Sequence, residues 1–146
     1  MTAAYLFDTT AVSEALRSRP NQRFVAWLRA LGRDRQFTSA VVAGELYAGA
    51  FRSAAPERWL RRIEEEALPA LTVLPFDTGV ARTYGEVQAR LRRAGTPIGD
   101  ADAQIAATAL THGLTLVTAN ARHYERVAGL AIEVFSPGAE AGHSVS

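Results

Sequence analysis

Residues 97–120, with the sequence PIGDADAQIAATALTHGLTLVTAN, predict a helix that leads directly into a strand. Gly99-Asp100 is a typical helix start, with Asp100 as the capping residue, and Gly113 is a typical helix stop. The residues TLVT at 115–118 form a short apolar run, as expected of a buried strand. A helix followed at once by a buried strand is typical of a parallel sheet covered by helices.

The rest of the chain repeats this alternation. Further strands are predicted at 3–7, 36–39, 71–76 and 132–135, and further helices at 9–18, 22–31, 41–52, 56–68 and 78–94. Thr9 or Thr10, Asn21, and Asp77 or Thr78 are the expected caps. The order predicts one α/β domain over residues 1–136, with a central, mostly parallel sheet of four to five short strands and helices on both faces. The small and polar residues 137–146 (PGAEAGHSVS) predict a flexible tail.

The composition excludes several kinds of chemistry. The 146 residues include no cysteine, which rules out disulfides, thiolate metal sites and a cysteine nucleophile. All sixteen basic residues are arginine, so P-loop and Schiff-base chemistry that needs lysine is also excluded. The net charge of +1 points to no partner, and no apolar run is long enough to span a membrane. We therefore expect a cytoplasmic protein that makes no membrane contact.

Asp8 stands directly after the first predicted strand, behind Tyr5, Leu6 and Phe7. Ligands of open parallel sheets bind at the carboxyl ends of the strands, which makes Asp8 a candidate site residue. Because Thr9 follows and a helix is predicted there, Asp8 is equally suited to cap that helix. Both roles stay open for Asp8 taken alone.

Two further acids stand where an apolar residue is expected. Glu45 is, apart from Tyr47, the only ionisable residue in FTSAVVAGELYAGAF at 37–51, so its carboxylate needs an arginine or a metal ion as partner. Asp102 shares a helix face with Ile105 and Ala106. A structural ion pair for Glu45 and a favourable helix-dipole position for Asp102 are the alternatives.

The three acids together indicate a functional site more strongly than each one alone, because a parallel sheet brings their positions to one edge. Asp8, Glu45 and Asp102 would repel one another there without a compensating cation. Oxygen ligands without His or Cys select Mg²⁺ or Mn²⁺. A divalent ion held by carboxylates, with open water positions, is suited to hydrolysing a phosphodiester.

Four segments of the chain resemble a known family. They are Phe7–Thr10, Ser39–Leu46, Pro97–Ala107 and Leu116–Asn120. In this order and spacing they resemble a PIN-domain ribonuclease, and more closely a toxin of the VapC type from a bacterial toxin–antitoxin pair. The resemblance covers residues 4 to 135.

The resemblance implies a metal-dependent endoribonuclease that leaves a 5′-phosphate and a 3′-hydroxyl. It makes Asp8, Glu45 and Asp102 the catalytic ligands of Mg²⁺ or Mn²⁺. Asn120 stands where relatives often have a fourth acid, which implies contact through a water molecule, and His123 stands where some relatives have a further acid. The positions expected to line the pocket are Thr9, Ser13, Asp100 and Thr118.

The resemblance also implies partners: an RNA substrate such as tRNA or ribosomal RNA, a small antitoxin that blocks the acidic pocket, and a second copy in a homodimer. The candidate RNA-binding residues are Arg82, Arg90, Arg92, Arg93 and Arg122. For each single arginine a solvated helix face is the alternative. For the whole protein the alternatives are an RNA-processing PIN nuclease without an antitoxin and a catalytically weak PIN binding module.

Overall fold

Five short strands form one parallel sheet in the computed structural model, which describes residues 3–138. The strands are β1 (Tyr5–Phe7), β2 (Gln36–Ser39), β3 (Thr72–Leu74), β4 (Thr115–Thr118) and β5 (Ile132–Val134). They lie in the order β3-β2-β1-β4-β5, with Leu6 of β1 opposite Phe37 of β2 and Leu116 of β4. The predicted α/β class and parallel sheet are confirmed.

The strand order fixes where a ligand site can form. The chain runs outward from the central β1 to β2 and β3, then returns to β4 and β5 on the other side of β1. Because parallel crossovers are right-handed, this reversal sends the connecting helices to opposite faces of the sheet. A crevice is therefore expected at the carboxyl ends of β1 and β4, where the direction of winding changes.

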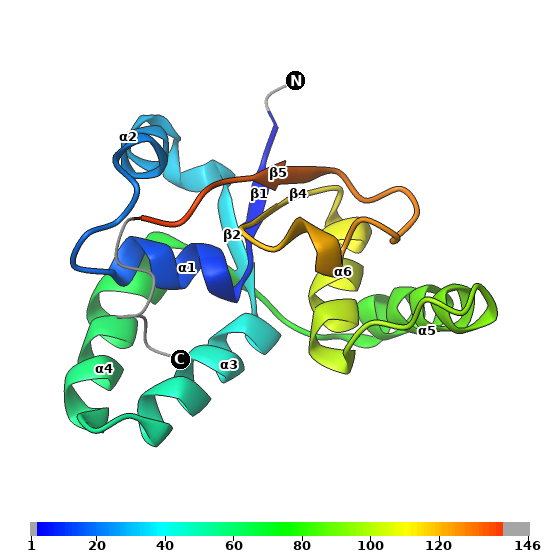
Figure 1. Ribbon diagram of the computed structural model, residues 1–146, viewed down its shortest axis with the longest axis horizontal. Coiled ribbons are helices and arrows are strands. Elements are labelled where there is room, and N and C mark those ends of the chain that lie inside the picture. Colours follow the sequence, from blue (N-terminus) through cyan, green and yellow to red (C-terminus); the bar gives the residue numbers. More distant parts are fainter. Residues whose placement is uncertain (1–2, 139–146) are drawn as a thin grey trace.

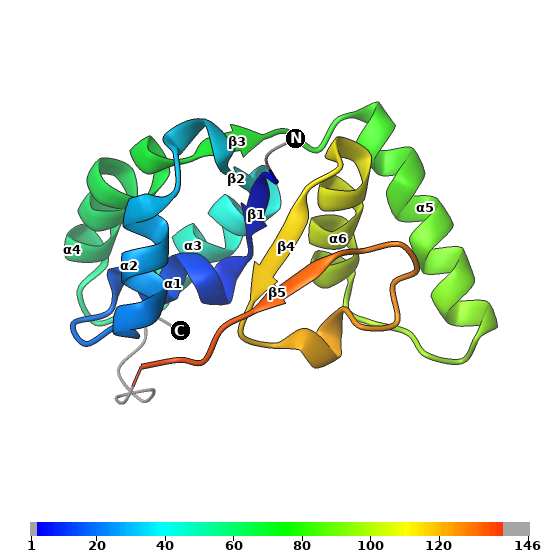
Figure 2. The ribbon, with the colours of Figure 1, turned by 90° about the horizontal axis from the view of Figure 1, so that it is seen from above.

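Six α-helices surround the sheet in the described part of the chain. They are α1 (Thr9–Leu16), α2 (Gln22–Ala30), α3 (Ala40–Arg52), α4 (Pro56–Arg62), α5 (Thr78–Arg93) and α6 (Asp100–His112). The first four gather on one side of the molecule, and α5 and α6 pack against each other on the other side (Figures 1 and 2). Short 3₁₀ turns at Arg33–Arg35 and Ala121–His123 complete the connections.

The core sits where the central strands meet the helices. Leu6 and Leu116 are fully buried in adjacent strands, and Val42 and Ile105 bring α3 and α6 onto them. Small buried residues such as Ala106 allow α6 to lie close to its neighbours. This packing leaves the loops after β1 and β4 as the polar end of the sheet.

Helix caps follow the sequence in part. The side chains of Asn21 and Asp77 accept hydrogen bonds from the backbone amides three residues ahead, as predicted. Gly113 closes α6 with a φ of 65°, a left-handed conformation that favours glycine. The prediction of Thr9 or Thr10 as a cap is wrong, because Asp8 accepts from the amide of Ala11.

Asp100 is not a cap either, since Gly99 holds the cap position and Asp100 is the first helical residue. The helix predicted over 56–68 ends as an α-helix at Arg62 and continues as a π-helical turn over Ile63–Ala67 and a 3₁₀ turn over Leu68–Ala70. Pro69 cannot continue an α-helix, because it has no N–H and its ring clashes with the preceding turn.

The predicted tail starts within the described residues. Gly138 donates its backbone amide to Glu14 Oε2 at 2.9 Å, so the chain is still in contact with α1 at this point. The other residues of that predicted tail, 139–146, lie outside the described residues.

Candidate functional site

Asp8 lies at the carboxyl end of β1, where the winding of the sheet reverses. Its side chain is only 3% exposed, and its backbone amide donates to Val117 of β4 at 3.1 Å. Asp8 Oδ1 accepts from the Thr10 hydroxyl at 2.6 Å and from the Ala11 amide at 3.0 Å. Thr10 Oγ1 in turn accepts from the amide of Ala119, just after β4, at 3.0 Å. The ends of β1 and β4 are thus tied together around this carboxylate.

Asp102 reaches the same place from the first turn of α6. The hydroxyl of Tyr124 lies 3.3 Å from Asp8 Oδ2 and 3.3 Å from Asp102 Oδ1, so it bridges the two acids. Asp102 Oδ2 faces His123 Nδ1 at 3.0 Å. The fold therefore brings together two of the three predicted acids.

Burial governs the protonation of Asp8 and Tyr124. It raises the pKa of the Asp8 carboxyl above its ordinary value of 3.8, and hydrogen bonds from Thr10, Thr118 and Ala11 lower it only part of the way back. Burial, together with the charges of Asp8 and Asp102, raises the pKa of Tyr124 far above its ordinary value. Tyr124 is therefore a neutral hydrogen-bond donor.

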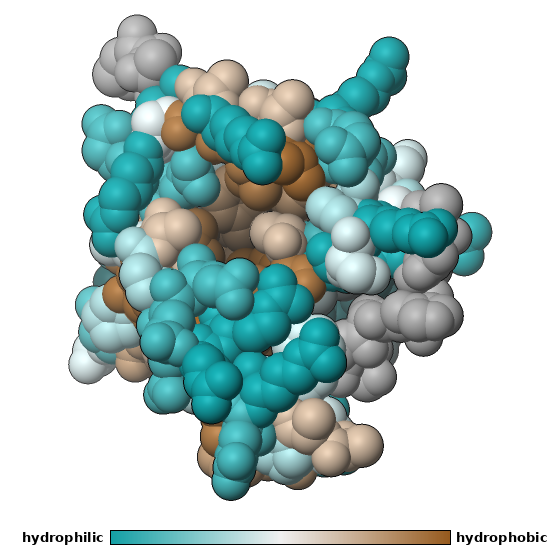
Figure 3. Space-filling view, turned by 90° about the vertical axis from the view of Figure 1, so that its left-hand side faces the viewer, coloured by the Kyte–Doolittle hydropathy of each residue, from teal (hydrophilic) through white to brown (hydrophobic). Residues whose placement is uncertain are grey.

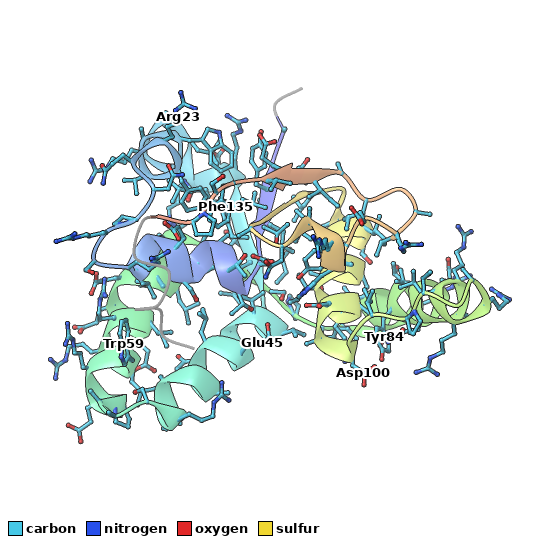
Figure 4. The ribbon with its side chains drawn as sticks, in the orientation of Figure 1. Arg23, Glu45, Trp59, Tyr84, Asp100 and Phe135 are labelled. Atoms are coloured by element: carbon cyan, nitrogen blue, oxygen red, sulfur yellow. The ribbon has the colours of Figure 1, made fainter. Side chains whose placement is uncertain are left out.

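Glu45 occupies a neighbouring position in α3 (Figure 4). It is half-buried, and the hydroxyl of Thr9 donates to its Oε1. Among residues 3–138 no three acidic or histidine side chains lie close enough together to form a metal cage. The expectation of three acids in one tight cluster is thus wrong in that detail, because Thr9 holds the Glu45 carboxylate.

Thr118 and Ser13 are two further residues that were expected to line the pocket. Thr118 is fully buried, and its hydroxyl accepts from the Asn120 amide at 2.9 Å, so both residues belong to the end of β4 beside Asp8. Ser13 is half-buried one turn after Thr9 in α1.

Asp100, also expected to line the pocket, contacts residues of α5. Its Oδ1 accepts from Gln88 Nε2 at 3.0 Å and from the Tyr84 hydroxyl at 3.4 Å, both in α5. Figure 4 shows Asp100 beside Tyr84 at the start of α6. Its partners are thus residues of α5, and its side chain works as a link between α5 and α6.

Tyr124 is the site residue that sequence reasoning missed. The signal was weak: a tyrosine three residues before Val127, in a segment after β4, resembles an ordinary core aromatic, and Tyr124 is indeed only 2% exposed. Only the fold shows that its hydroxyl meets two carboxylates.

The arginines predicted to bind RNA are all exposed. Arg82 lies 3.7 Å from Glu86 in α5. Arg90 and Arg126 line a hollow of about 290 Å³ between α5, α6 and the segment after Tyr124. Arg122 lines a second hollow beside Asn120 and His123, at the end of β4. Arg92 and Arg93 lie in the last turn of α5. Among these arginines, Arg122 brings positive charge to the end of β4, beside the His123 that faces Asp102.

A separate apolar hollow of about 230 Å³ opens between α1, α2 and the segment after α4. Val12, Leu16, Phe24 and Leu28 line it. Figure 3 shows this face of the molecule as an apolar depression ringed by hydrophilic side chains.

The fold is that of a PIN domain. The PIN-domain family model matches residues 5–130, and the chain belongs to this family. Among curated proteins it is similar to VapC ribonuclease Y4jK of Sinorhizobium fredii, with 36% identity covering 87% of this chain and 94% of the relative. It is equally similar to the tRNA(fMet)-specific endonuclease VapC of Salmonella typhimurium, with 36% identity over 88% and 96% of the two chains. Toxin FitB of Neisseria gonorrhoeae is 37% identical over 77% of this chain and 85% of its own.

Solved structures give the same result. The chain superposes on a chain of FitAcB from Neisseria gonorrhoeae with a TM-score of 0.79 and 34% identity, covering 88% of this chain and 95% of that one. It superposes on a chain of VapBC2 from Rickettsia felis, solved with a DNA fragment from its promoter, with a TM-score of 0.84 and 26% identity over 91% and 99%. The family match inferred from the sequence segments is confirmed.

Proposed function

We propose that this chain is a divalent-metal-dependent endoribonuclease of the VapC type, acting as the toxin of a toxin–antitoxin pair. The observation that carries the proposal is the convergence of Asp8 and Asp102 on one hydroxyl at the switch point of the sheet. It occurs in a chain that resembles named VapC ribonucleases over most of its length.

The residues present fit Mg²⁺ or Mn²⁺. Asp8 and Asp102 offer oxygen ligands, and a cation beside them would favour the charged form of the Asp8 carboxyl, whose pKa is raised by burial. Mg²⁺ in particular keeps several waters and needs only one or two protein carboxylates. Asp8 and Asp102 would hold the ion directly, with Glu45 and Asn120 reached through water molecules.

The ion, when bound, supplies positive charge that lowers the pKa of a water molecule and offsets charge on the phosphoryl oxygens. The chain supplies the rest. Asp8 and Asp102 are held in place by hydrogen bonds, and the Thr9 hydroxyl orients the Glu45 carboxylate. Arg122, at the end of β4, offsets part of the repulsion between the RNA backbone and the acids.

The partners follow from the relatives. The solved relatives FitAcB, VapBC2 and VapBC support a small cognate antitoxin for this chain, and we infer a homodimer from its membership of the same family. In the described residues no helix is long and apolar enough to cross a bilayer. We propose a cytoplasmic site of action, on RNA such as tRNA or ribosomal RNA.

The experiment is cleavage of purified total RNA by antitoxin-free protein in Mg²⁺, in Mn²⁺ and in EDTA. We expect discrete fragments that require metal and that fall by about 100-fold or more in Asp102→Asn, because an ion ligand is lost. Asp34→Asn, in an exposed turn before β2, is the matched control and should cleave like the wild type. Intact RNA from folded wild-type protein under every metal condition would contradict the proposal, as would unchanged cleavage by Asp102→Asn.

A further inference from the structure

Tyr124 is buried between two acids that come from opposite parts of the chain. Its ring is only 2% exposed, and it follows the 3₁₀ turn Ala121–His123 after β4. Its hydroxyl is equidistant, at 3.3 Å, from Asp8 Oδ2 after β1 and from Asp102 Oδ1 at the start of α6. A phenylalanine would fill the same space, so the hydroxyl itself calls for an explanation.

The hydrogen bonds around Asp8 determine which of its oxygens is open to a cation. A carboxylate oxygen has two lone pairs, and each hydrogen bond occupies one of them. Asp8 Oδ1 accepts from both Thr10 and Ala11, so both of its lone pairs are in use. Asp8 Oδ2 accepts from Tyr124. Among these hydrogen bonds Oδ2 has only the one from Tyr124, so Oδ2, which flanks the tyrosine hydroxyl, is the more open oxygen of Asp8.

The same accounting applies to Asp102. Its Oδ2 faces His123 Nδ1 at 3.0 Å, and its Oδ1 faces Tyr124. Each oxygen of Asp102 therefore keeps one lone pair for an ion, and that of Oδ1 lies beside the tyrosine hydroxyl. Tyr124 stands between Asp8 Oδ2 and Asp102 Oδ1, and sets their relative position.

One hydroxyl has one proton, so it cannot satisfy both carboxylates at once. When Tyr124 donates to Asp8, the Asp102 oxygen faces a lone pair of the hydroxyl oxygen, and the reverse holds when it donates to Asp102. A cation next to both carboxylates removes this mismatch, because it supplies the positive charge that the single proton cannot. The bridge is thus complete only with an ion beside it.

We propose that Tyr124 is a positioning residue for the metal: its hydroxyl holds Asp8 Oδ2 and Asp102 Oδ1 at the separation from which they bind one divalent ion. The inference rests on the proposed function, since it concerns the ion of that reaction. Tyr124 acts through the two carboxylates and does not contact the RNA. Loss of its hydroxyl therefore weakens metal binding, and excess metal restores the reaction.

The test is Mn²⁺ binding to the purified full chain, measured from the electron paramagnetic resonance signal of free Mn²⁺. Tyr124→Phe should bind Mn²⁺ about 10-fold more weakly than the wild type, as is typical when a residue that orients a metal ligand is removed. Tyr47→Phe is the matched control, because the Tyr47 hydroxyl bonds to the exposed Glu64 at 3.1 Å, away from these acids. It should bind like the wild type. RNA cleavage by Tyr124→Phe should need more Mn²⁺ for half-maximal rate and reach the wild-type rate at saturation.

The outcomes separate this inference from the proposed function. If the wild type binds Mn²⁺, Asp102→Asn does not, and Tyr124→Phe matches the wild type, then the positioning role is wrong and the metal site stands. If the wild type itself binds no Mn²⁺, both are overturned. A Tyr124→Phe rate that excess Mn²⁺ does not restore would overturn the positioning role in favour of a purely structural one.

A measurement on wild-type protein covers the case in which Tyr124→Phe does not fold. Tyrosine labelled with ¹³C at Cζ gives separate resonances, assigned by Phe substitution of Tyr5, Tyr47 and Tyr84. Addition of Mg²⁺ should shift the Tyr124 resonance, because its two acceptors lose charge to the ion, and should leave that of Tyr47 in place. A Tyr124 resonance that does not move at saturating Mg²⁺ would overturn the inference.

Discussion

At the scale of single residues, Asp8 combines two roles that the sequence left open as alternatives. It caps α1 through the amide of Ala11, and it places its second oxygen beside Asp102 and Tyr124. The two roles are compatible because they use different oxygens of one carboxylate. An acid after a strand need not be either a cap or a site residue; a short strand-to-helix turn permits both.

The raised pKa of Asp8 predicts a pH dependence of stability in the metal-free protein. Because the folded state binds the Asp8 proton more tightly than the unfolded chain, the contribution of Asp8 to the unfolding free energy is fully present below about pH 3.8. It is lost as the pH rises through the raised pKa, and Asp8 is then a buried charge. Asp8→Asn keeps the cap without this charge. In EDTA at pH 7 we expect Asp8→Asn to be more stable than the wild type, measured by urea unfolding.

The comparison across pH provides the control for this prediction. The gain in unfolding free energy from Asp8→Asn should shrink as the pH falls toward 4, because the wild-type carboxyl then carries its proton. Asp34→Asn, exposed in the turn before β2, should show no such trend. A gain for Asp8→Asn that is equal at both pH values would contradict the assignment to the Asp8 proton.

At the scale of elements, Glu14 joins parts of the chain that are far apart in sequence. It is 2% exposed in α1, and its carboxylate accepts from Arg17 Nη1 at 2.9 Å, from the amide of Asn21 at 2.7 Å and from the amide of Gly138 at 2.9 Å. Asn21 also donates its side-chain amide to the backbone oxygen of Ser136. One buried carboxylate thus holds the start of α2 and the segment after β5 against α1.

Glu14→Ala should therefore destabilise the protein by about 3–5 kcal/mol, because it leaves the Arg17 charge buried without its partner. The measurement is the unfolding free energy from urea denaturation. Glu86→Ala, which removes an exposed α5 carboxylate 3.7 Å from Arg82, is the control and should cost about 1 kcal/mol or less. Equal losses for the two variants would show that Glu14 is not the link between these elements.

The sequence was most informative about the bounds of strands and the starts of helices. The strands β2 and β4 were predicted at their observed bounds, and Asn21 and Asp77 marked two helix starts, because these signals lie within a few neighbouring residues. The π-helical turn after α4 had no such local mark. Among the candidate site residues, the convergence of Asp8 and Asp102 was predicted from the parallel sheet, which brings both positions to one edge. The Tyr124 bridge and the Thr9–Glu45 contact did not, since both depend on how remote loops pack.

At the scale of the whole molecule, acids and arginines are separated from an apolar hollow. The acids lie at the carboxyl ends of β1 and β4, with Arg122 beside them, and the hollow lies between α1, α2 and the segment after α4. A monomer that keeps an apolar depression open to water gains from covering it. The acids in turn repel any partner that does not bring positive charge. The proposed antitoxin therefore needs an apolar segment and a basic residue.

Co-expression with the product of the adjacent small gene tests this arrangement in the intact protein. We expect a stable complex on size-exclusion chromatography that no longer cleaves RNA and binds Mn²⁺ at least about 10-fold more weakly than the free chain, because a basic side chain at Asp8 and Asp102 competes with the ion. Leu28→Glu, at the apolar hollow, should weaken the complex, and Asp34→Asn, in the exposed turn before β2, should not. A chain that cleaves RNA yet forms no complex would instead be a PIN nuclease that acts without an antitoxin. A complex that leaves Mn²⁺ binding unchanged would place the antitoxin away from the acids.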